Sequence, residues 1–228
     1  MKDNRIPEGK PEEQVAPTIF WRIDEWFPDL SRESKVQLKT YHEELLKYNR
    51  TISLISAKLV FVADALLFAD SILASRAIMT NNPGIDKIHD IGSGAGFPGV
   101  VFALLYPQVQ VVLIETDQKK AEFLNHVIAV LNLKNVSVEN KSIEAFPESS
   151  IKFAMARGFA NISRTLLMAR KPMGKGSSLF HLKGEEWGME VSEIPSQLCS
   201  LWSPSLVGEY KLPVGPVKFG IVRTEKIQ

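Results

Sequence analysis

The chain has 228 residues, of which 45% are hydrophobic and 23% are charged, with a formal net charge of +1. That composition is ordinary for a globular protein, and the length suffices to bury one sizeable core. The near-neutral charge excludes a generally basic nucleic-acid-binding protein, so an RNA contact would need a local patch of cations. Cys199 is the single cysteine, which excludes an internal disulfide and agrees with a reducing compartment.

The sequence shows no pattern of a secretion signal or of a membrane span. Its N-terminal stretch, MKDNRIPEGKPEEQ, is polar throughout. The most apolar run, residues 59–74, is interrupted by Asp64 and Asp70 and is shorter than a membrane span requires. We therefore expect a cytoplasmic protein that has no membrane partner.

The first third of the chain predicts a set of helices. Residues 1–15 are rich in Lys, Glu, Pro and Gly, which is typical of a mobile arm. The aromatic-rich residues 18–30 predict a short docking helix. Ser31 can cap a second helix, which should end near Asn49, because its apolar residues recur at steps of three and four. A third helical stretch over residues 57–79 is so apolar that most of it should be covered.

The stretch Lys87–Gly99, read KIHDIGSGAGFPG, organises the rest of the chain. A short β-type run, Lys87–Ile91, is followed by glycines at alternate positions. Glycine adopts positive φ easily and lets the backbone approach a ligand with no Cβ in the way. Pro98 suits the first turn of a helix, where its missing N–H is tolerated. The pattern predicts a strand, a ligand-binding loop and a helix in direct succession.

Strands and helices alternate after this loop, which predicts a doubly wound α/β sheet that binds ligands at the carboxyl ends of its strands. Further strands are expected at residues 109–115, 136–140, 153–157 and 177–182, with helices at 118–131 and 162–169. The last two β-type runs, 206–212 and 217–224, are separated only by PVGP, which is too short for a crossover helix. They should form an antiparallel hairpin at one edge of a mostly parallel seven-stranded sheet.

The glycine loop fits two classes of ligand. Gly94, Gly96 and Gly99 match the dinucleotide fingerprint, and Glu115 follows after about 20 residues, where it could bind ribose hydroxyls. A second pattern starts earlier in the same stretch. Asp90, Gly92, Gly94 and Gly96 form the acid-x-G-x-G-x-G pattern of S-adenosylmethionine methyltransferases. A carboxylate at the strand end would attract the cationic part of S-adenosylmethionine and would repel a pyrophosphate. We favour S-adenosylmethionine and keep a dinucleotide as the alternative.

Polar groups that follow the other strands complete the candidate cofactor site. The Glu115 carboxylate can accept hydrogen bonds from two ribose hydroxyls, or it is a surface acid near two lysines. The turn that carries Ser142, Ile143 and Glu144 could present amides and an apolar wall to an adenine ring, although a plain loop explains it equally well. These residues should meet in the crevice at the carboxyl ends of the strands.

Four further residues are candidates for the reaction or for the substrate. Arg157 directly follows an apolar strand and keeps its charge, so it could hold a carboxylate, a phosphate or guanine O6, or form a structural ion pair. Lys183 could contact phosphate, or be a solvated lysine. Asp70 and Ser71 are polar exceptions in an apolar helix, where local hydrogen bonding is an equal explanation. The four histidines show no metal-ligand spacing, so we propose no metal site.

Several motifs, in a fixed order, match one known family. They are DIGSGAGFPG, Lys119-Lys120 with Phe123-Leu124, Ala156–Ala160, Leu182–Gly184 and Tyr210–Pro213. With them the chain resembles the small-subunit ribosomal RNA methyltransferase G family, also called glucose-inhibited division protein B. The resemblance covers roughly residues 35–225. It implies a Rossmann-like methyltransferase domain over 81–228 behind a helical cap over 16–80.

The resemblance also implies an activity and the residues that serve it. The activity is transfer of a methyl group from S-adenosylmethionine to N7 of a guanine in 16S ribosomal RNA, as free RNA or in the small subunit. We assign cofactor binding to Asp90, Gly92, Gly94, Gly96, Phe97, Glu115, Ile143, Glu144 and Arg157. Arg157 is also the catalytic candidate, and Lys183, Asp70 and Ser71 are assigned to the RNA side. We expect a monomer.

The chain departs from the family pattern on the substrate side. Where the family usually reads N-L-T, this sequence has Ser53-Leu54-Ile55, and Leu66 and Leu67 replace the arginine and histidine of the family motif R-H-x-x-D-S. These departures motivate a second hypothesis, a cofactor-binding protein with lost or altered methylation. A nicotinamide-dependent reductase is the third.

Overall fold

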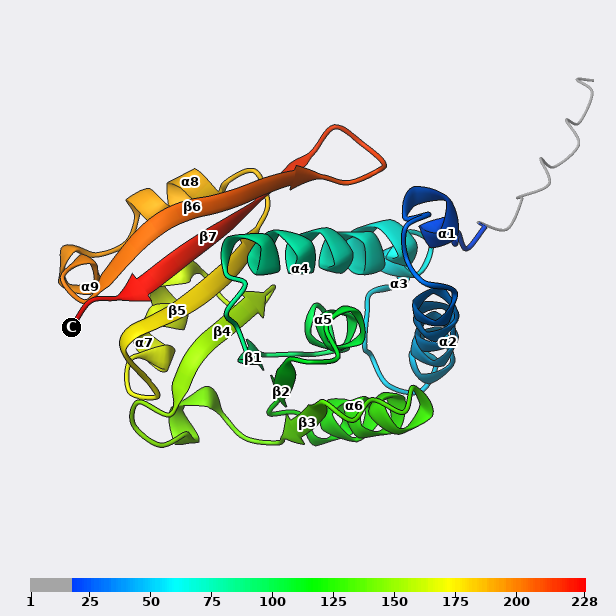
Figure 1. Ribbon diagram of the computed structural model, residues 1–228, viewed down its shortest axis with the longest axis horizontal. Coiled ribbons are helices and arrows are strands. Elements are labelled where there is room, and N and C mark those ends of the chain that lie inside the picture. Colours follow the sequence, from blue (N-terminus) through cyan, green and yellow to red (C-terminus); the bar gives the residue numbers. More distant parts are fainter. Residues whose placement is uncertain (1–17) are drawn as a thin grey trace, which may run out of the picture.

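The computed structural model describes residues 18–228, and the arm expected over residues 1–15 lies outside them. Seven strands form a single sheet in the order β3-β2-β1-β4-β5-β7-β6 (Figure 1). The strands are β1 Lys87–Ile91, β2 Gln110–Ile114, β3 Val136–Glu139, β4 Ile151–Arg157, β5 Met173–Lys183, β6 Trp202–Lys211 and β7 Lys218–Lys226. Strands β1 to β5 pair in parallel, whereas β7 pairs antiparallel with β5 and with β6. The predicted mostly parallel sheet with an antiparallel C-terminal hairpin is confirmed.

Helices cover both faces of the sheet (Figure 1). The elements before the sheet are α1 Ile23–Trp26, α2 Arg32–Tyr48, α3 Ala57–Val60, η1 Asp64–Ala69, which is a π-helix, and α4 Asp70–Asn81. Between and after the strands lie α5 Gly99–Leu105, α6 Gln118–Val130, the short 3₁₀ helix η2 Ile143–Ala145, α7 Ile162–Ala169, α8 Trp187–Ser192 and α9 Ser196–Cys199. The sequence analysis did not anticipate α8 and α9, which are too short for a clear apolar period.

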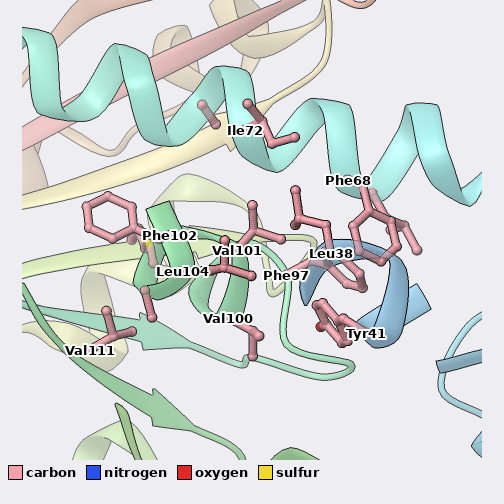
Figure 2. Packing of buried hydrophobic residues seen from close by; sticks show 14 of the residues in the cluster. Leu38, Tyr41, Phe68, Ile72, Phe97, Val100, Val101, Phe102, Leu104 and Val111 are labelled. Carbon is pink, nitrogen blue, oxygen red and sulfur yellow. The ribbon is translucent and has the colours of Figure 1, made fainter. Parts of the chain in front are cut away.

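Two hydrophobic clusters lie on opposite faces of the sheet, because successive side chains of a strand point in opposite directions. On β2, Val111 and Leu113 belong to the cluster that also contains α4, α5 and α6, whereas Val112 and Ile114 belong to the cluster under α7. The side chains on both faces of β2 are buried, which explains why the sequence of such a strand is a continuous apolar run. Figure 2 shows the first cluster, in which α5 packs between the sheet and α4.

The N-terminal helices are fixed to the glycine loop by aromatic packing. Ser31 caps α2 by accepting a hydrogen bond from the Ser34 amide, as predicted. Tyr41 of α2 stacks on Phe97 with ring centroids 5.0 Å apart, and Phe68 of η1 meets Phe97 edge-on at 5.0 Å (Figure 2). The cap therefore packs directly against the loop that follows β1.

The helical stretch expected over 57–79 is broken in the structure. It divides into α3, η1 and α4, with a turn before Asp64. The buried carboxylate of Asp64 accepts hydrogen bonds from the backbone and the guanidinium of Arg22, at 2.8 to 3.1 Å. This contact between segments 42 residues apart explains why the pattern of apolar residues alone did not reveal the break.

None of the helices within residues 18–228 combines the length and the apolar character that crossing a bilayer requires. The same residues contain no cluster of three or more His, Cys, Asp or Glu side chains that could hold a metal ion.

Candidate functional site

A cavity of about 410 Å³ lies at the carboxyl ends of β1, β2 and β4. Its lining comes from the cap (Leu54, Ile55, Ser56, Leu59, Leu67), the glycine loop (Gly92, Ser93, Gly94, Ala95, Phe97), the end of β2 (Glu115, Thr116, Lys120) and the end of β4 (Arg157, Gly158, Phe159). This is the edge of a parallel sheet where ligands bind. The structure thus brings together Gly92, Gly94, Phe97, Glu115 and Arg157 from the predicted set.

The glycines of the loop serve different purposes. Gly92, Gly94 and Gly96 all have positive φ. A Cβ on Gly92 would lie 2.3 Å from the Phe159 ring, and one on Gly96 would lie 2.5 Å from the Tyr41 hydroxyl, so both glycines make room for packing. Gly94 lines the cavity, and a Cβ there would have no neighbour closer than 3.9 Å.

The amides of the loop are largely used within the protein. The N–H groups of Gly92 and Ser93 both donate to the Ile114 carbonyl, and the Gly96 amide donates to the Ser93 carbonyl. The Gly94 amide donates to Glu115 and the Gly99 amide to Asp90. A pyrophosphate site needs a set of free loop amides at a helix N-terminus. Because these donors already have partners, the geometry disfavours the dinucleotide alternative.

Asp90 does not face the cavity, contrary to the expectation from the sequence. Its side chain is fully buried, and one carboxylate oxygen accepts a hydrogen bond from the Gly99 amide at 3.1 Å. Burial raises the pKa of Asp90 to about 7, so the carboxyl is partly protonated near neutral pH. Asp90 fastens the start of α5 to the end of β1, and the direct attraction of a cationic cofactor that we expected from it has no support in this arrangement.

Glu115 provides the carboxylate of the cavity. One oxygen accepts the Gly94 amide and the other accepts the Asp117 amide, each at 2.8 Å. Asn140 donates to the Glu115 carbonyl at 2.8 Å and holds the backbone at the end of β2. Each carboxylate oxygen has a second lone pair. The fixed carboxylate can therefore still accept hydrogen bonds from two hydroxyl groups of a ligand.

A smaller cavity of about 40 Å³ adjoins the main one. Gly92, Thr116 and Phe159 line both, and Ile143 lines the smaller one. Ser142 caps η2 by accepting the Glu144 amide at 3.3 Å, which leaves Ile143 pointing inward. The predicted turn thus places Ile143 at a narrow apolar slot, whereas Glu144 is exposed and lines neither cavity.

Arg157, which lines the cavity, forms an ion pair with Asp70. Arg157 Nε donates to Asp70 Oδ2 at 2.5 Å, and Arg157 Nη2 donates to the Leu66 carbonyl in the π-helix at 2.6 Å. A guanidinium has five N–H donors, and its hydrogen bonds to residues 18–228 use two of them, so three are open to a ligand. Asp70, which we had assigned to the RNA, is only 1% exposed and serves Arg157 instead.

The other two residues assigned to RNA lie away from the cavity lining. Lys183 Nζ forms an ion pair with Glu190 and donates to the Ala160 carbonyl, both at 2.8 Å. Glu190 also accepts the Ile162 amide at 2.9 Å, so this cluster ties the loop after β4 to α8. The Ser71 side chain is completely buried in α4. Neither residue lines the cavity.

The sequence departures fall on one wall of the cavity. Leu54, Ile55 and Leu67, which stand at or beside positions where the family is polar, all line it, and Leu59 extends this apolar wall. Leu67 is 3% exposed. The apolar wall and Phe159 are site features that the sequence analysis did not predict, since single apolar residues give no signal of a ligand site.

Comparisons with known sequences identify the family. Residues 34–203 match the family model described as rRNA small subunit methyltransferase G. Over 227 residues, which cover this chain and its relative completely, the sequence is 66% identical to Ribosomal RNA small subunit methyltransferase G 3 of Bdellovibrio bacteriovorus. It is 33% identical to Ribosomal RNA small subunit methyltransferase G of Paracoccus denitrificans over 167 residues, or 73% of this chain and 84% of that one.

Solved structures show the same fold at low sequence identity. A SAM-dependent methyltransferase from Aquifex aeolicus has a TM-score of 0.53 and 14% identity, covering 81% of this chain and 98% of that chain. The tRNA methyltransferase TrmI from Aquifex aeolicus has a TM-score of 0.51 and 14% identity, covering 70% and 69%. These likenesses establish the fold alone. The match to the family model and the full-length relative go further: the chain belongs to the rRNA small subunit methyltransferase G family.

Proposed function

We propose that this chain transfers a methyl group from S-adenosylmethionine to N7 of a guanine in 16S ribosomal RNA. Membership of the methyltransferase G family supports the reaction and the cofactor. The observation that carries the site is the cavity in which the Glu115 carboxylate, the open backbone of Gly94 and the guanidinium of Arg157 converge.

The residues of the cavity fit the proposed cofactor. The Glu115 carboxylate would accept the ribose hydroxyls, and Ile143 with Phe159 would flank the adenine in the narrow slot. A Cβ on Gly94 or Gly158 would meet nothing closer than 3.9 Å, so both glycines keep cavity space open for the ligand. When bound, S-adenosylmethionine supplies an electrophilic methyl group.

The chemistry demands little of the protein beyond positioning. Guanine N7 carries an in-plane lone pair in the neutral base, so methylation there needs no general base. A productive complex holds reacting atoms about 3 to 3.5 Å apart, and such orientation supplies much of the rate. We assign this task to Arg157, whose three remaining N–H donors can orient the base or its phosphate. A missing histidine at position 67 is compatible with this chemistry.

The decisive experiment measures methyl transfer and its position. The full chain is incubated with labelled S-adenosylmethionine and either small ribosomal subunits or naked 16S RNA, and the product is digested and mapped. We expect 7-methylguanine at a discrete site, and its loss in a deletion strain. Arg157→Ala should lose far more turnover than Lys183→Ala. Label on another atom, or equal activity of Arg157→Ala and the unmodified chain, would overturn the assignment.

One observation favours a second candidate, a cofactor-binding protein whose RNA methylation is lost or altered. In the wall made by Leu54, Ile55, Leu59 and Leu67, two members, Ile55 and Leu67, stand where the family pattern has the polar residues Thr and His. Calorimetry with S-adenosylhomocysteine separates the candidates when combined with the transfer assay. Binding together with transfer supports the enzyme, whereas binding without transfer supports the second candidate.

We further propose that the chain acts as a cytoplasmic monomer on 16S RNA, with residues 16–80 as the cap and 81–228 as the catalytic domain. The aromatic contacts of Phe97 with Tyr41 and Phe68 support one compact unit of cap and domain. Light scattering on the purified chain checks the oligomeric state, and a single cooperative unfolding transition would support the compact unit.

A further inference from the structure

Tyr210 lies next to the ion pair of Arg157 and Asp70 without belonging to the cavity lining. Its hydroxyl donates a hydrogen bond to Asp70 Oδ1 at 2.6 Å, while Asp70 Oδ2 accepts the one from Arg157 Nε at 2.5 Å. The three residues come from β6, α4 and β4. A chain of hydrogen bonds therefore runs from the edge strand of the sheet to the guanidinium in the cavity.

A β-bulge explains why Tyr210 points to Asp70. Leu206 pairs with Val222 and Gly208 pairs with Ile221, so Val207 is an extra residue in β6. After the bulge, the side chains of β6 exchange faces. Tyr210 consequently shares the face of Ile221, which belongs to the cluster under α4, instead of the face of Val222 on the opposite side. The backbone irregularity directs one hydroxyl toward α4.

We propose that Tyr210 is a positioning residue for methyl transfer, which holds the Asp70 carboxylate so that Arg157 keeps one orientation in the cavity. This inference rests on the proposed function. Asp70 is 1% exposed, so loss of the tyrosine hydroxyl would leave one carboxylate oxygen buried without that donor. The carboxylate could then rotate to use both oxygens on Arg157, which would turn the guanidinium. The Leu66 carbonyl accepts a hydrogen bond from the other side of the same guanidinium. Together, the Asp70 carboxylate and the Leu66 carbonyl define the plane of the guanidinium.

The test variant is Tyr210→Phe in the full chain, which removes the hydroxyl and keeps the ring stacked on Phe219, whose centroid lies 5.8 Å away. A small misplacement of a positioned group costs up to about a hundredfold in rate, so we expect kcat to fall about ten- to a hundredfold. The KM for S-adenosylmethionine and the Kd for S-adenosylhomocysteine should change less than about twofold. Tyr106→Phe is the matched control, because the Tyr106 hydroxyl makes no hydrogen bond within residues 18–228 and lies outside the cavity lining.

A double-mutant cycle asks whether Tyr210 acts through Arg157. On the background Arg157→Ala, Tyr210→Phe should have no further effect on the residual kcat, since residues that act as a unit are not additive. The same fall in kcat on both backgrounds, or no fall in the single variant, would overturn the proposal.

A second readout does not depend on methyl transfer. The Nε–H resonance of Arg157 can be assigned in the ¹H–¹⁵N spectrum through its absence from Arg157→Lys. In Tyr210→Phe this proton should exchange with solvent about tenfold faster, the effect expected from one weakened hydrogen bond. An unchanged exchange rate would refute the positioning role. If the unmodified chain transfers no methyl group, the proposed function fails, and the exchange measurement still decides whether Tyr210 orders Arg157.

Discussion

The two walls of the cavity are built differently. The loop wall consists of glycine backbone and the Glu115 carboxylate, held by hydrogen bonds of 2.8 Å. The cap wall consists of four aliphatic side chains, Leu54 and Ile55 from the connection between α2 and α3, Leu59 from α3 and Leu67 from η1. The loop wall keeps the family motifs, and the cap wall departs from them at Ile55 and Leu67. A ligand shared by the whole family would bind at the loop wall, while the cap wall can change with the substrate.

From this difference between the two walls, we expect that changes in the loop wall affect stability and cofactor affinity. Changes in the cap wall should affect the handling of RNA. Four experiments can separate these effects.

The largest effect is expected for Gly96→Ala. The new Cβ would approach the Tyr41 hydroxyl to 2.5 Å and Val100 to 2.7 Å, at a φ of +96°. Overpacking and backbone strain together should lower the free energy of unfolding by about 3 kcal/mol. Gly176→Ala, with a φ of +80° and no neighbour within 4 Å, is the control and should lose only about 1 kcal/mol. Urea denaturation measures both, and equal losses would contradict the packing argument.

Glu115→Gln tests the loop wall as the cofactor site. The amide keeps the shape but offers one acceptor oxygen, so hydrogen bonds to a charged carboxylate are lost and affinity for S-adenosylhomocysteine should fall about ten- to a hundredfold. Calorimetry measures the Kd. Glu148→Gln, an exposed change away from the cavity, should leave the Kd unaltered. An unchanged Kd in Glu115→Gln would remove this carboxylate from the proposed site.

Leu67→Ala tests the cap wall. We expect kcat/KM for RNA to fall about tenfold, because the wall that positions the base recedes, while the Kd for S-adenosylhomocysteine stays within about twofold. Leu45→Ala is the matched control, since Leu45 is fully buried in α2 and does not line the cavity. Both variants should lose about 2 to 3 kcal/mol of stability. A parallel loss of RNA turnover in Leu45→Ala would show that the effect comes from the fold and not from the wall.

The smallest effect concerns the attachment of the cap to the catalytic domain. Glu44 of α2 accepts a hydrogen bond from His126 of α6 at 2.6 Å. Partial burial opposes ionisation of Glu44, but hydrogen bonds from His126 and Lys47 outweigh it, so its pKa is lowered. A lowered carboxyl pKa stabilises the fold above the unfolded value near 4.5, and this contribution is lost as pH falls through the folded pKa.

Glu44→Gln should therefore cost about 0.5 kcal/mol at pH 7, as expected for a partly exposed pair. The cost should vanish at pH 3. Thermal unfolding of both chains across this range provides the measurement, and a cost that grows on acidification would have the wrong sign.

The sequence by itself determined the order of the strands and the place of the loop wall. Short apolar, β-branched runs predict the strands, glycines at Gly92, Gly94 and Gly96 predict the bend, and Ser31 predicts the start of α2. These features are local, since a strand, a turn or a cap is specified by residues that are near neighbours in the chain. The hairpin followed from the same logic, because four residues cannot form a crossover.

The tertiary structure alone decided which polar side chains face the cavity. Asp90 turned under the loop to hold Gly99, Lys183 turned to Glu190, and Asp70 took Arg157 as its partner. Arg157 and Tyr210 lie 87 and 140 residues from Asp70 in the chain. A local pattern can place a carboxylate at the end of a strand, but its partner depends on which distant segments pack beside it. Burial then makes that pairing compulsory, because an unpaired buried charge is costly.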